Sequence, residues 1–232
     1  MRPLKIVLGV AGLLVLAIVV ARTMFSVQIG EAAYKAAVKT NIGRHALTEA
    51  PDGLTLVLVG TGSPMPDPGR AGPMTVVAAG DRVFIVDAGA GSGRRFGELR
   101  LPWENVEAAF LTHYHSDHID GLGEVVLQYW AAGGAEAPLS VHGPDGVARV
   151  VAGFNEAYAQ DSVYRIAHHG PQTVHPSGHG AVAVPFSPAS DPVRVYERDG
   201  LSVTAISVDH DPIHPAVAYR FDYKGRSVTI SG

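Results

Sequence analysis

One short stretch, residues 112–122, restricts both the fold and the chemistry of this chain. Four candidate metal ligands fall within six residues of this stretch: His113, His115, Asp117 and His118. The apolar residues Ala108–Leu111 before it predict a short buried strand, so the ligands begin where that strand ends. His113 and His115 are two residues apart, and side chains at that spacing on extended backbone point to the same side. The stretch therefore predicts a metal site on a loop held by a strand.

The second half of this cluster lies where the chain is expected to turn into a helix over Ile119–Trp130, capped by Ser116 or Asp117. Asp117 and His118 diverge at that turn and can address a second ion near the first. Imidazole and carboxylate ligands suit zinc, and two such divalent ions can activate a water molecule. Asp117 is then the candidate to orient the nucleophile or accept its proton. The alternative is a surface loop with scattered histidines, because the chain contains 11 of them.

Further motifs occur in a fixed order along residues 54–232. They are Leu58–Pro64 followed by Arg70, Phe84–Gly89, Val208–His210 followed by Pro215–Arg220, and Ser227–Gly232. Together with the His-x-His-x-Asp-His cluster, they resemble the metallo-β-lactamase superfamily, in its ribonuclease Z and arylsulfatase-like branch. The resemblance implies a four-layer αββα sandwich, whereas the element pattern alone indicates only a mixed α/β domain.

The resemblance also implies a ligand set. His210 is the third histidine of the first metal site, beside His113 and His115, and it is favoured over His214. Asp117 and His118 belong to the second site. In the superfamily, the residue after Gly232 would be the aspartate that bridges both metals, and a later histidine would complete the second site. The resemblance therefore implies a fold incomplete at its C-terminus, the N-terminal portion of a longer enzyme, inactive when taken alone.

Two other regions carry candidate site residues. Asp87 ends a predicted strand, Arg82–Asp87, and it is either a turn-capping residue or a partner that orients a metal-bound histidine. Residues 161–192 are rich in Pro and Gly and predict a long loop that shapes the substrate pocket. Tyr164 and Arg165 are its candidate substrate contacts. The histidines of this segment could instead form an accessory metal patch.

The N-terminal residues predict export. Arg2 and Lys5 precede an apolar run, Ile6–Ala21, that ends at Arg22. Residues 1–22 are therefore either a cleaved signal peptide or a signal anchor in a membrane, and both place the rest of the chain outside the cytoplasm, anchored, periplasmic or secreted. Residues 23–53 form a linker with a short helix over Glu31–Lys39. Residues 54–232 form the hydrolase domain.

The net charge and the absence of cysteine restrict the kinds of substrate and site. The net charge is −4 and no polybasic stripe is present, which argues against a large polyanion such as tRNA, although nucleic acid stays an alternative. The chain has no cysteine, which excludes disulfides, thiolate zinc sites and a cysteine nucleophile. We expect hydrolysis of a small-molecule ester, either a phosphodiester or an aryl sulfate, by a chain that can form a homodimer. The alternatives are a lactonase, thioesterase or β-lactamase of the same superfamily, or a non-catalytic membrane-tethered metal-binding module.

Overall fold

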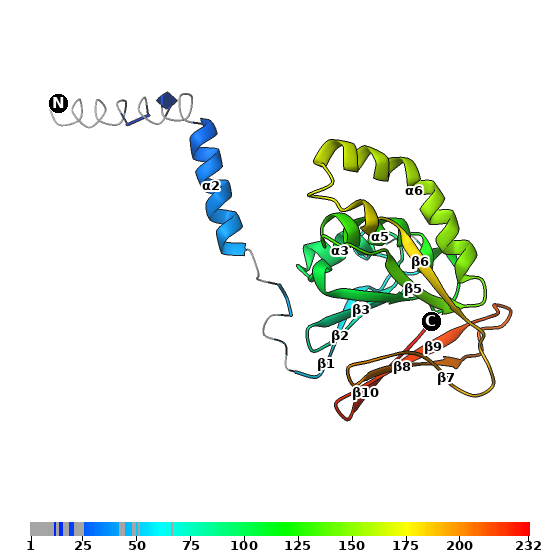
Figure 1. The fold of residues 1–232 in the computed structure, drawn as a ribbon. Coiled ribbons are helices and arrows are strands. Elements are labelled where there is room, and N and C mark those ends of the chain that lie inside the picture. Colours follow the sequence, from blue (N-terminus) through cyan, green and yellow to red (C-terminus); the bar gives the residue numbers. More distant parts are fainter. Residues whose placement is uncertain are drawn as a thin grey trace. The chain divides into compact units, whose positions relative to one another are not determined.

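The computed structural model describes residues 12, 14–15, 19–20, 26–41, 45–47, 50, 52–65 and 67–232, and it divides into two units, residues 1–44 and 45–232 (Figure 1). The smaller unit contains helix α2, Ser26–Asn41, in which Lys35 lies 2.7 Å from Glu31 one turn earlier. No helix within the described residues is long and apolar enough to cross a membrane. Most of the segment 1–22 lies outside the described residues, so export stays a prediction.

The larger unit contains a six-stranded sheet with the strand order β1-β2-β3-β4-β5-β6. The strands are β1 Leu54–Gly60, β2 Met74–Ala79, β3 Arg82–Val86, β4 Val106–Phe110, β5 Leu139–Pro144 and β6 Ala181–Phe186. Strands β1 to β3 pair antiparallel, and β3 to β6 pair parallel. Parallel pairing brings the carboxyl ends of β3, β4 and β5 to one edge of the sheet, where ligands usually bind.

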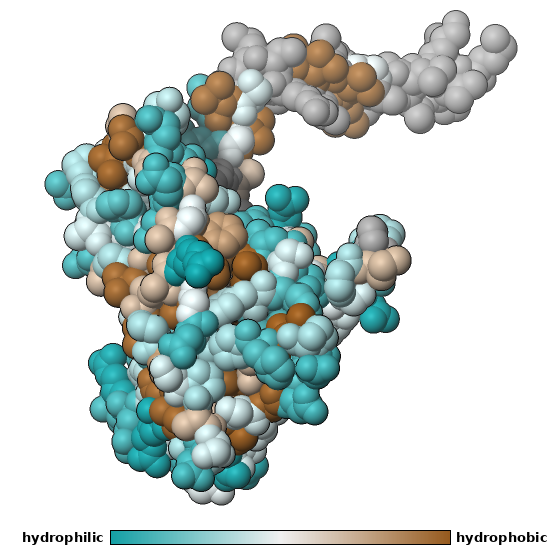
Figure 2. Space-filling view, turned by 90° about the vertical axis from the view of Figure 1, so that its right-hand side faces the viewer, coloured by the Kyte–Doolittle hydropathy of each residue, from teal (hydrophilic) through white to brown (hydrophobic). Residues whose placement is uncertain are grey.

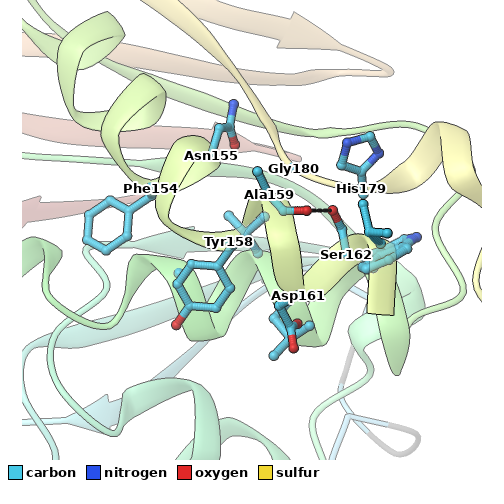
Figure 3. Close-up of a pocket in the computed structure, with 13 residues that line it drawn as sticks. Phe154, Asn155, Tyr158, Ala159, Asp161, Ser162, His179 and Gly180 are labelled. Carbon is cyan, nitrogen blue, oxygen red and sulfur yellow. Dashed lines mark hydrogen bonds between the residues drawn. The ribbon is translucent and has the colours of Figure 1, made fainter. Parts of the chain in front are cut away.

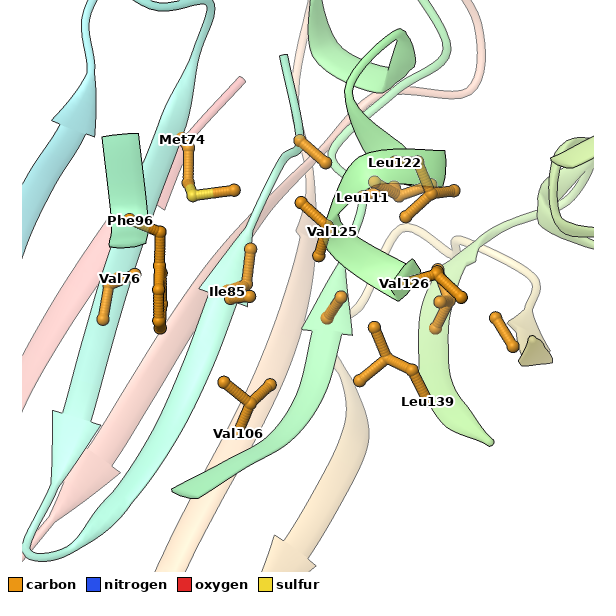
Figure 4. Packing of buried hydrophobic residues seen from close by; sticks show 14 of the residues in the cluster. Met74, Val76, Ile85, Phe96, Val106, Leu111, Leu122, Val125, Val126 and Leu139 are labelled. Atoms are coloured by element: carbon orange, nitrogen blue, oxygen red, sulfur yellow. The ribbon is translucent and has the colours of Figure 1, made fainter. Parts of the chain in front are cut away.

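Helices cover one face of this sheet. They are α3 Ser92–Glu98, α4 Ser116–Ile119, α5 Leu122–Ala131 and α6 Val147–His169, with 3-10 turns η1 Trp103–Asn105 and η2 Pro176–Gly178. Figure 4 shows the apolar core between sheet and helices, where Ile85, Leu111, Leu122 and Val125 are fully buried. Each such side chain contributes about 1.5–3 kcal/mol relative to an exposed one. This packing holds α5 against the sheet directly after the predicted metal loop.

A second, antiparallel sheet packs on the other face, in the order β10-β9-β8-β7 (Figure 1). Its strands are β7 Val193–Arg198, β8 Leu201–Ser207, β9 Val217–Tyr223 and β10 Arg226–Ser231. Phe84 and Phe110 of the first sheet pack against Phe221 of the second, with ring centroids 6.0 and 5.5 Å away. In the described part of residues 45–232, the layers are therefore helices, sheet and sheet. They confirm the predicted sandwich, in three of its four layers.

The predicted helix Ile119–Trp130 is broken into α4 and α5. Neither of its proposed caps is used: the residue before α5 is Gly121, which has no side chain, and α4 has no side-chain cap. The chain turns at Gly121 because the amide of this residue donates to Ala88 O at 2.8 Å. A Cβ atom at Gly121 would lie 2.1 Å from Gly89 O. Tertiary packing against the segment after β3 therefore overrides the helical pattern.

The prediction of a long loop over residues 161–192 was also wrong. Helix α6 continues to His169 and ends at Gly170, which has φ 81°, and residues 181–186 form β6 beside β5. The helix continues because Pro and Gly begin only at residue 170, and because Arg165 Nε donates to Asp161 Oδ2 at 2.6 Å one turn earlier. Strand β6 is apolar and completes the edge of the sheet.

Hydrophobic side chains remain exposed in small groups. On the face shown in Figure 2, hydrophilic residues separate the hydrophobic ones into patches. The larger unit exposes Leu56 and Leu58 on β1, an edge strand, together with Val163 and Tyr164 on α6. Small scattered apolar patches are normal on a protein surface, so these residues alone indicate no function.

His142 makes the folding stability depend on pH. It is 6% exposed and its ring stacks on Phe110 at 4.8 Å, and Nδ1 has no hydrogen-bond partner among the described residues. Burial lowers the pKa of His142 to about 4, whereas an unfolded histidine has a pKa of about 6.5. Between these values the unfolded chain binds more protons. Stability is therefore expected to fall on acidification from about pH 6.5 to about 4, by up to about 3 kcal/mol.

Denaturant titrations of the wild type and His142→Phe at several pH values test this expectation. Phenylalanine keeps a flat ring against Phe110 and removes the titrating group. The loss of stability between pH 7 and 4.5 is expected to be smaller in the variant, by about 2–3 kcal/mol. An equal loss in both proteins would show that His142 does not contribute.

Candidate metal centre

The structure brings three histidines together. His113, His115 and His210 each offer a ring nitrogen, and these atoms all lie within 4.8 Å of one another. His113 Nε2 is 2.9 Å from His115 Nδ1. Their ring centroids are 4.8 and 5.4 Å from the ring of His210, respectively. His214, in contrast, is exposed and lies 3.6 Å from Asp211 Oδ1.

Contacts between the two sheets place His210 in this group, because His210 lies on the segment between β8 and β9. The amide of Val217, at the start of β9, donates to Thr112 O at 3.0 Å. The buried hydroxyl of Tyr219 donates to Leu111 O at 2.7 Å. Both carbonyls belong to the residues that lead into the predicted metal loop. The third histidine therefore reaches the loop through contacts across more than 100 residues of sequence.

Asp87 supports this loop from the end of β3. It is 4% exposed and adopts φ 61°, a conformation that aspartate tolerates better than most residues. Its carboxylate accepts hydrogen bonds from the Thr112 amide at 2.8 Å, from the Thr112 hydroxyl at 2.8 Å, and from His118 Nδ1 at 2.7 Å. This geometry supports the role of a residue that orients metal ligands.

The same hydrogen bonds show which ring nitrogen carries the proton in His113 and in His118. The Thr112 hydroxyl has one proton, which it donates to Asp87, so it accepts at 3.0 Å from Nδ1–H of His113. Nε2 of His113 is then unprotonated, and it lies 2.9 Å from His115 Nδ1. His118 likewise donates Nδ1–H to Asp87 and keeps its Nε2 free. Each of these rings therefore presents a nitrogen suited to a metal, with the other nitrogen held by a partner.

Asp117 and His118 lie beside the three histidines. His118 Nε2 is 3.7 Å from Asp117 Oδ2, and the ring centroids of His118 and His113 are 4.2 Å apart. Both side chains are partly buried at the start of α4. Two more donors thus flank the histidine group, which is the arrangement that a second ion would need.

Burial and neighbouring charges affect the pKa values of His113 and His118 differently. Burial, reinforced by the neighbouring His118, lowers the pKa of His113 to about 4. His113 is therefore neutral at pH 7, as a metal ligand must be. Burial also lowers the pKa of His118, but the hydrogen bond and charge of Asp87 outweigh it and raise that pKa above its ordinary value.

A depression of about 420 Å³ opens beside Asp117. It is lined by Asp117 and by residues of the β1–β2 loop, among them Ser63 and Arg70. Asp120 also faces it, and burial raises the pKa of that carboxyl. Tyr164 and Arg165 do not line this depression, because they lie on α6, where Tyr164 is exposed and Arg165 pairs with Asp161. The substrate contacts that the sequence analysis proposed are thus not brought to the site.

Thr112 is a supporting residue that the sequence pattern did not predict. Thr112 links Asp87 to His113, yet it reads as an ordinary polar residue at the end of a strand. Its position directly before the first ligand was the only available signal. The Asp87 contact could not be read from the chain, because 25 residues separate the two side chains.

Residues 67–232 match the metallo-beta-lactamase superfamily, and the chain belongs to this superfamily. Ribonuclease Z of Mycobacterium avium (strain 104) is 39% identical over 181 residues, which cover 77% of this chain and 62% of that relative. Ribonuclease Z of Mycobacterium marinum is 38% identical over 187 residues, with the same shares. The chain therefore spans about 62% of the length of these curated relatives.

Solved structures show the same fold. The short form of human tRNase Z matches with a TM-score of 0.57 at 20% identity, covering 76% of this chain and 68% of that one. The metallo-beta-lactamase fold protein YhfI from Bacillus subtilis matches with a TM-score of 0.54 at 20% identity, covering 78% and 63%. At this identity the likeness concerns the fold, and it agrees with the predicted sandwich.

Proposed function

We propose that this chain carries the metal-binding part of a hydrolase that cleaves phosphodiesters. The observation that supports this most is the group of His113, His115 and His210, assembled from two distant segments with the ring proton of His113 already fixed. Three imidazoles fit a zinc-type ion, and Asp117 with His118 would contribute to a second. Such ions supply an activated water at neutral pH and polarise the scissile group.

The protein's own residues would position substrate and proton. Asp117 lines the depression and lies next to His118, so it can orient the nucleophile or accept its proton. Arg70 offers the positive charge for a non-bridging ester oxygen. The depression contains three carboxylates, those of Asp67, Asp117 and Asp120, against this one guanidinium. Anionic substrate would therefore bind well only when divalent cations offset the carboxylates.

Two observations bear on the substrate class, and they favour different substrates. The relatives are named ribonuclease Z, which favours an RNA phosphodiester. A net charge of −4 favours a smaller ester, since RNA binding usually requires a basic surface. We therefore propose phosphodiester chemistry for the site, with a small phosphodiester as the alternative to RNA. An aryl sulfate is the competing ester class. Export, membrane attachment and dimer formation are separate proposals from the sequence.

Removing His210 tests the metal site. His210→Ala is expected to weaken zinc binding by more than the roughly 10–100-fold typical of an orienting partner, because it removes a ligand. His214→Ala, four residues away and outside the histidine group, is the matched control and should bind zinc like the wild type. Competition with a chromophoric chelator measures both affinities. Equal affinities in the two variants would contradict the proposed ligand set.

A substrate panel tests the reaction. Zinc-loaded, full-length gene product is assayed on single-stranded RNA, bis(4-nitrophenyl) phosphate, 4-nitrophenyl sulfate and an acyl lactone. Turnover of the two phosphodiesters and not of the others is the expected result. Turnover of sulfate or lactone alone would contradict phosphodiester chemistry. A protein that does not bind zinc at all would contradict the proposed hydrolase function and favour a non-catalytic module.

A further inference from the structure

A separate cavity lies between helices α5 and α6 (Figure 3), and none of the proposed metal ligands lines it. It encloses about 240 Å³. Val126 and Trp130 of α5 form one wall, and Phe154 and Tyr158 of α6 form the other. His179, between η2 and β6, also lines it. The cavity is thus bounded mainly by aromatic and aliphatic side chains, as small-molecule sites usually are.

Its size restricts what could occupy it. An apolar cavity of about 150 Å³ is enough to bind benzene, so 240 Å³ accommodates one aromatic ring system with a substituent. A helix of a partner protein, about 10–12 Å across, is far too wide. The inner wall is well buried, since Trp130 is 2% exposed and Val126 is 8% exposed. A ring placed there would lose most of its contact with water.

Three polar side chains of the cavity, those of Ser162, His179 and Asp161, offer acceptors. The Ser162 hydroxyl donates its single proton to Ala159 O at 2.7 Å (Figure 3), so only its lone pairs are left. His179 Nδ1 lies 2.6 Å from Pro176 O and must donate to it, which leaves Nε2 as an acceptor. Asp161 adds a carboxylate, one oxygen of which binds Arg165.

Tyr158 adds a phenolic hydroxyl to the wall, which can donate or accept. Another polar side chain, Asn155, is held in place by the backbone of Ala181. It donates to Ala181 O at 2.8 Å and accepts from the Ala181 amide at 2.9 Å. A ligand that brings its own donor would therefore meet these acceptors, whereas an anion would be repelled by the Asp161 carboxylate.

We propose that this cavity binds a small neutral aromatic molecule that carries one N–H or O–H donor, of the phenol or indole class. The ring would pack between Trp130, Phe154 and Tyr158, and its donor would meet Ser162, His179 or Asp161. The proposal is independent of the hydrolytic function proposed above. Helix α5 nevertheless connects the two sites, because Gly123 lines the cavity one residue after α5 begins and five residues after His118.

Two exposed alanines of α6 provide a matched test. Ala159 lines the cavity and Ala157 does not, and both side chains are exposed. Ala159→Trp is expected to fill the cavity, whereas Ala157→Trp adds the same side chain to a different face of the helix. Indole and phenol are titrated into the ¹⁵N-labelled full chain, and the Nε1–H signal of Trp130 is followed by NMR. Benzoate is the anionic comparison.

Saturable shifts with indole and phenol are expected in the wild type and in Ala157→Trp. The dissociation constant should rise at least about tenfold in Ala159→Trp, and benzoate should bind at least about tenfold more weakly than phenol. Val163→Trp, at a second exposed position of the lining, replaces Ala159→Trp if that variant does not fold.

Three results would overturn the proposal. The first is an unshifted Trp130 signal at millimolar indole and phenol. The second is unchanged binding in both filling variants. The third combines two observations: sedimentation detects a dimer that the filling variants break, and neither probe shifts the Trp130 signal. A second copy of the chain would then cover the cavity.

Discussion

Asp87→Ala is expected to lower the free energy of unfolding by about 3 kcal/mol or more and zinc affinity by about 10–100-fold. The carboxylate accepts hydrogen bonds from the Thr112 amide, the Thr112 hydroxyl and His118 Nδ1, and it is 4% exposed. Alanine leaves these buried donors without an acceptor, at about 1–3 kcal/mol for each unsatisfied group. It also removes the group that holds the His118 ring and, through Thr112, the His113 ring.

Asp87→Asn separates the loss of folding stability from the loss of zinc affinity. Asparagine tolerates φ 61° and keeps one oxygen for the Thr112 amide, so it should destabilise the fold less than alanine does. Its NH2 group replaces the oxygen that accepts from Thr112 Oγ1 and His118 Nδ1, and this group can accept from neither, so zinc affinity should still fall at least about tenfold. Asp191→Ala, at an exposed loop position, is the control. Urea titrations and chelator competition measure the two quantities. Wild-type zinc affinity in Asp87→Asn would show that the carboxylate does not orient the ligands.

Gly121→Ala is expected to destabilise the larger unit by about 3 kcal/mol or more, the upper part of the range for overpacked positions. A Cβ at Gly121 would lie 2.1 Å from Gly89 O and 3.0 Å from Ala88 O. Both neighbours are backbone atoms and cannot rotate away. The change would push apart the segment after β3 and the turn between α4 and α5, and it would displace His118, whose carbonyl accepts from Ala88 N.

Gly153→Ala is the matched control for this substitution. Gly153 lies within α6, and nothing would come within 4 Å of its Cβ. Alanine there should stabilise the protein by about 0.5–1 kcal/mol, because glycine is the poorer helix former. Thermal unfolding of both variants gives the comparison. A Gly121→Ala protein that unfolds like the wild type would show that the two backbone segments are not held in contact.

Much of the fold could be predicted from residue patterns and the family resemblance. Strands β3 and β4 fall within about two residues of their expected positions, Arg82–Asp87 and Ala108–Leu111, because apolar runs bounded by turn residues identify buried strands. Strand β6 was missed because a Pro- and Gly-rich segment precedes it. The end of α6 was missed for a related reason, since its last turns were grouped with that segment.

The sequence by itself determined the local part of the histidine group. The two-residue spacing of His113 and His115 after a buried strand directs both side chains to one side, and this follows from backbone geometry alone. The break between α4 and α5 was decided by tertiary structure, because it depends on how closely Gly121 approaches Gly89.

Only the tertiary structure decided that Asp87 meets Thr112 and that His210 joins the histidine group. Asp87 meets Thr112 because β3 and β4 pair in parallel, which brings the ends of both strands to one edge of the sheet. His210 reaches His113 because the second sheet packs on the first and Val217 bonds to Thr112. These contacts join residues far apart in the chain, and their formation depends on burial across whole sheets, which no local pattern of residues encodes.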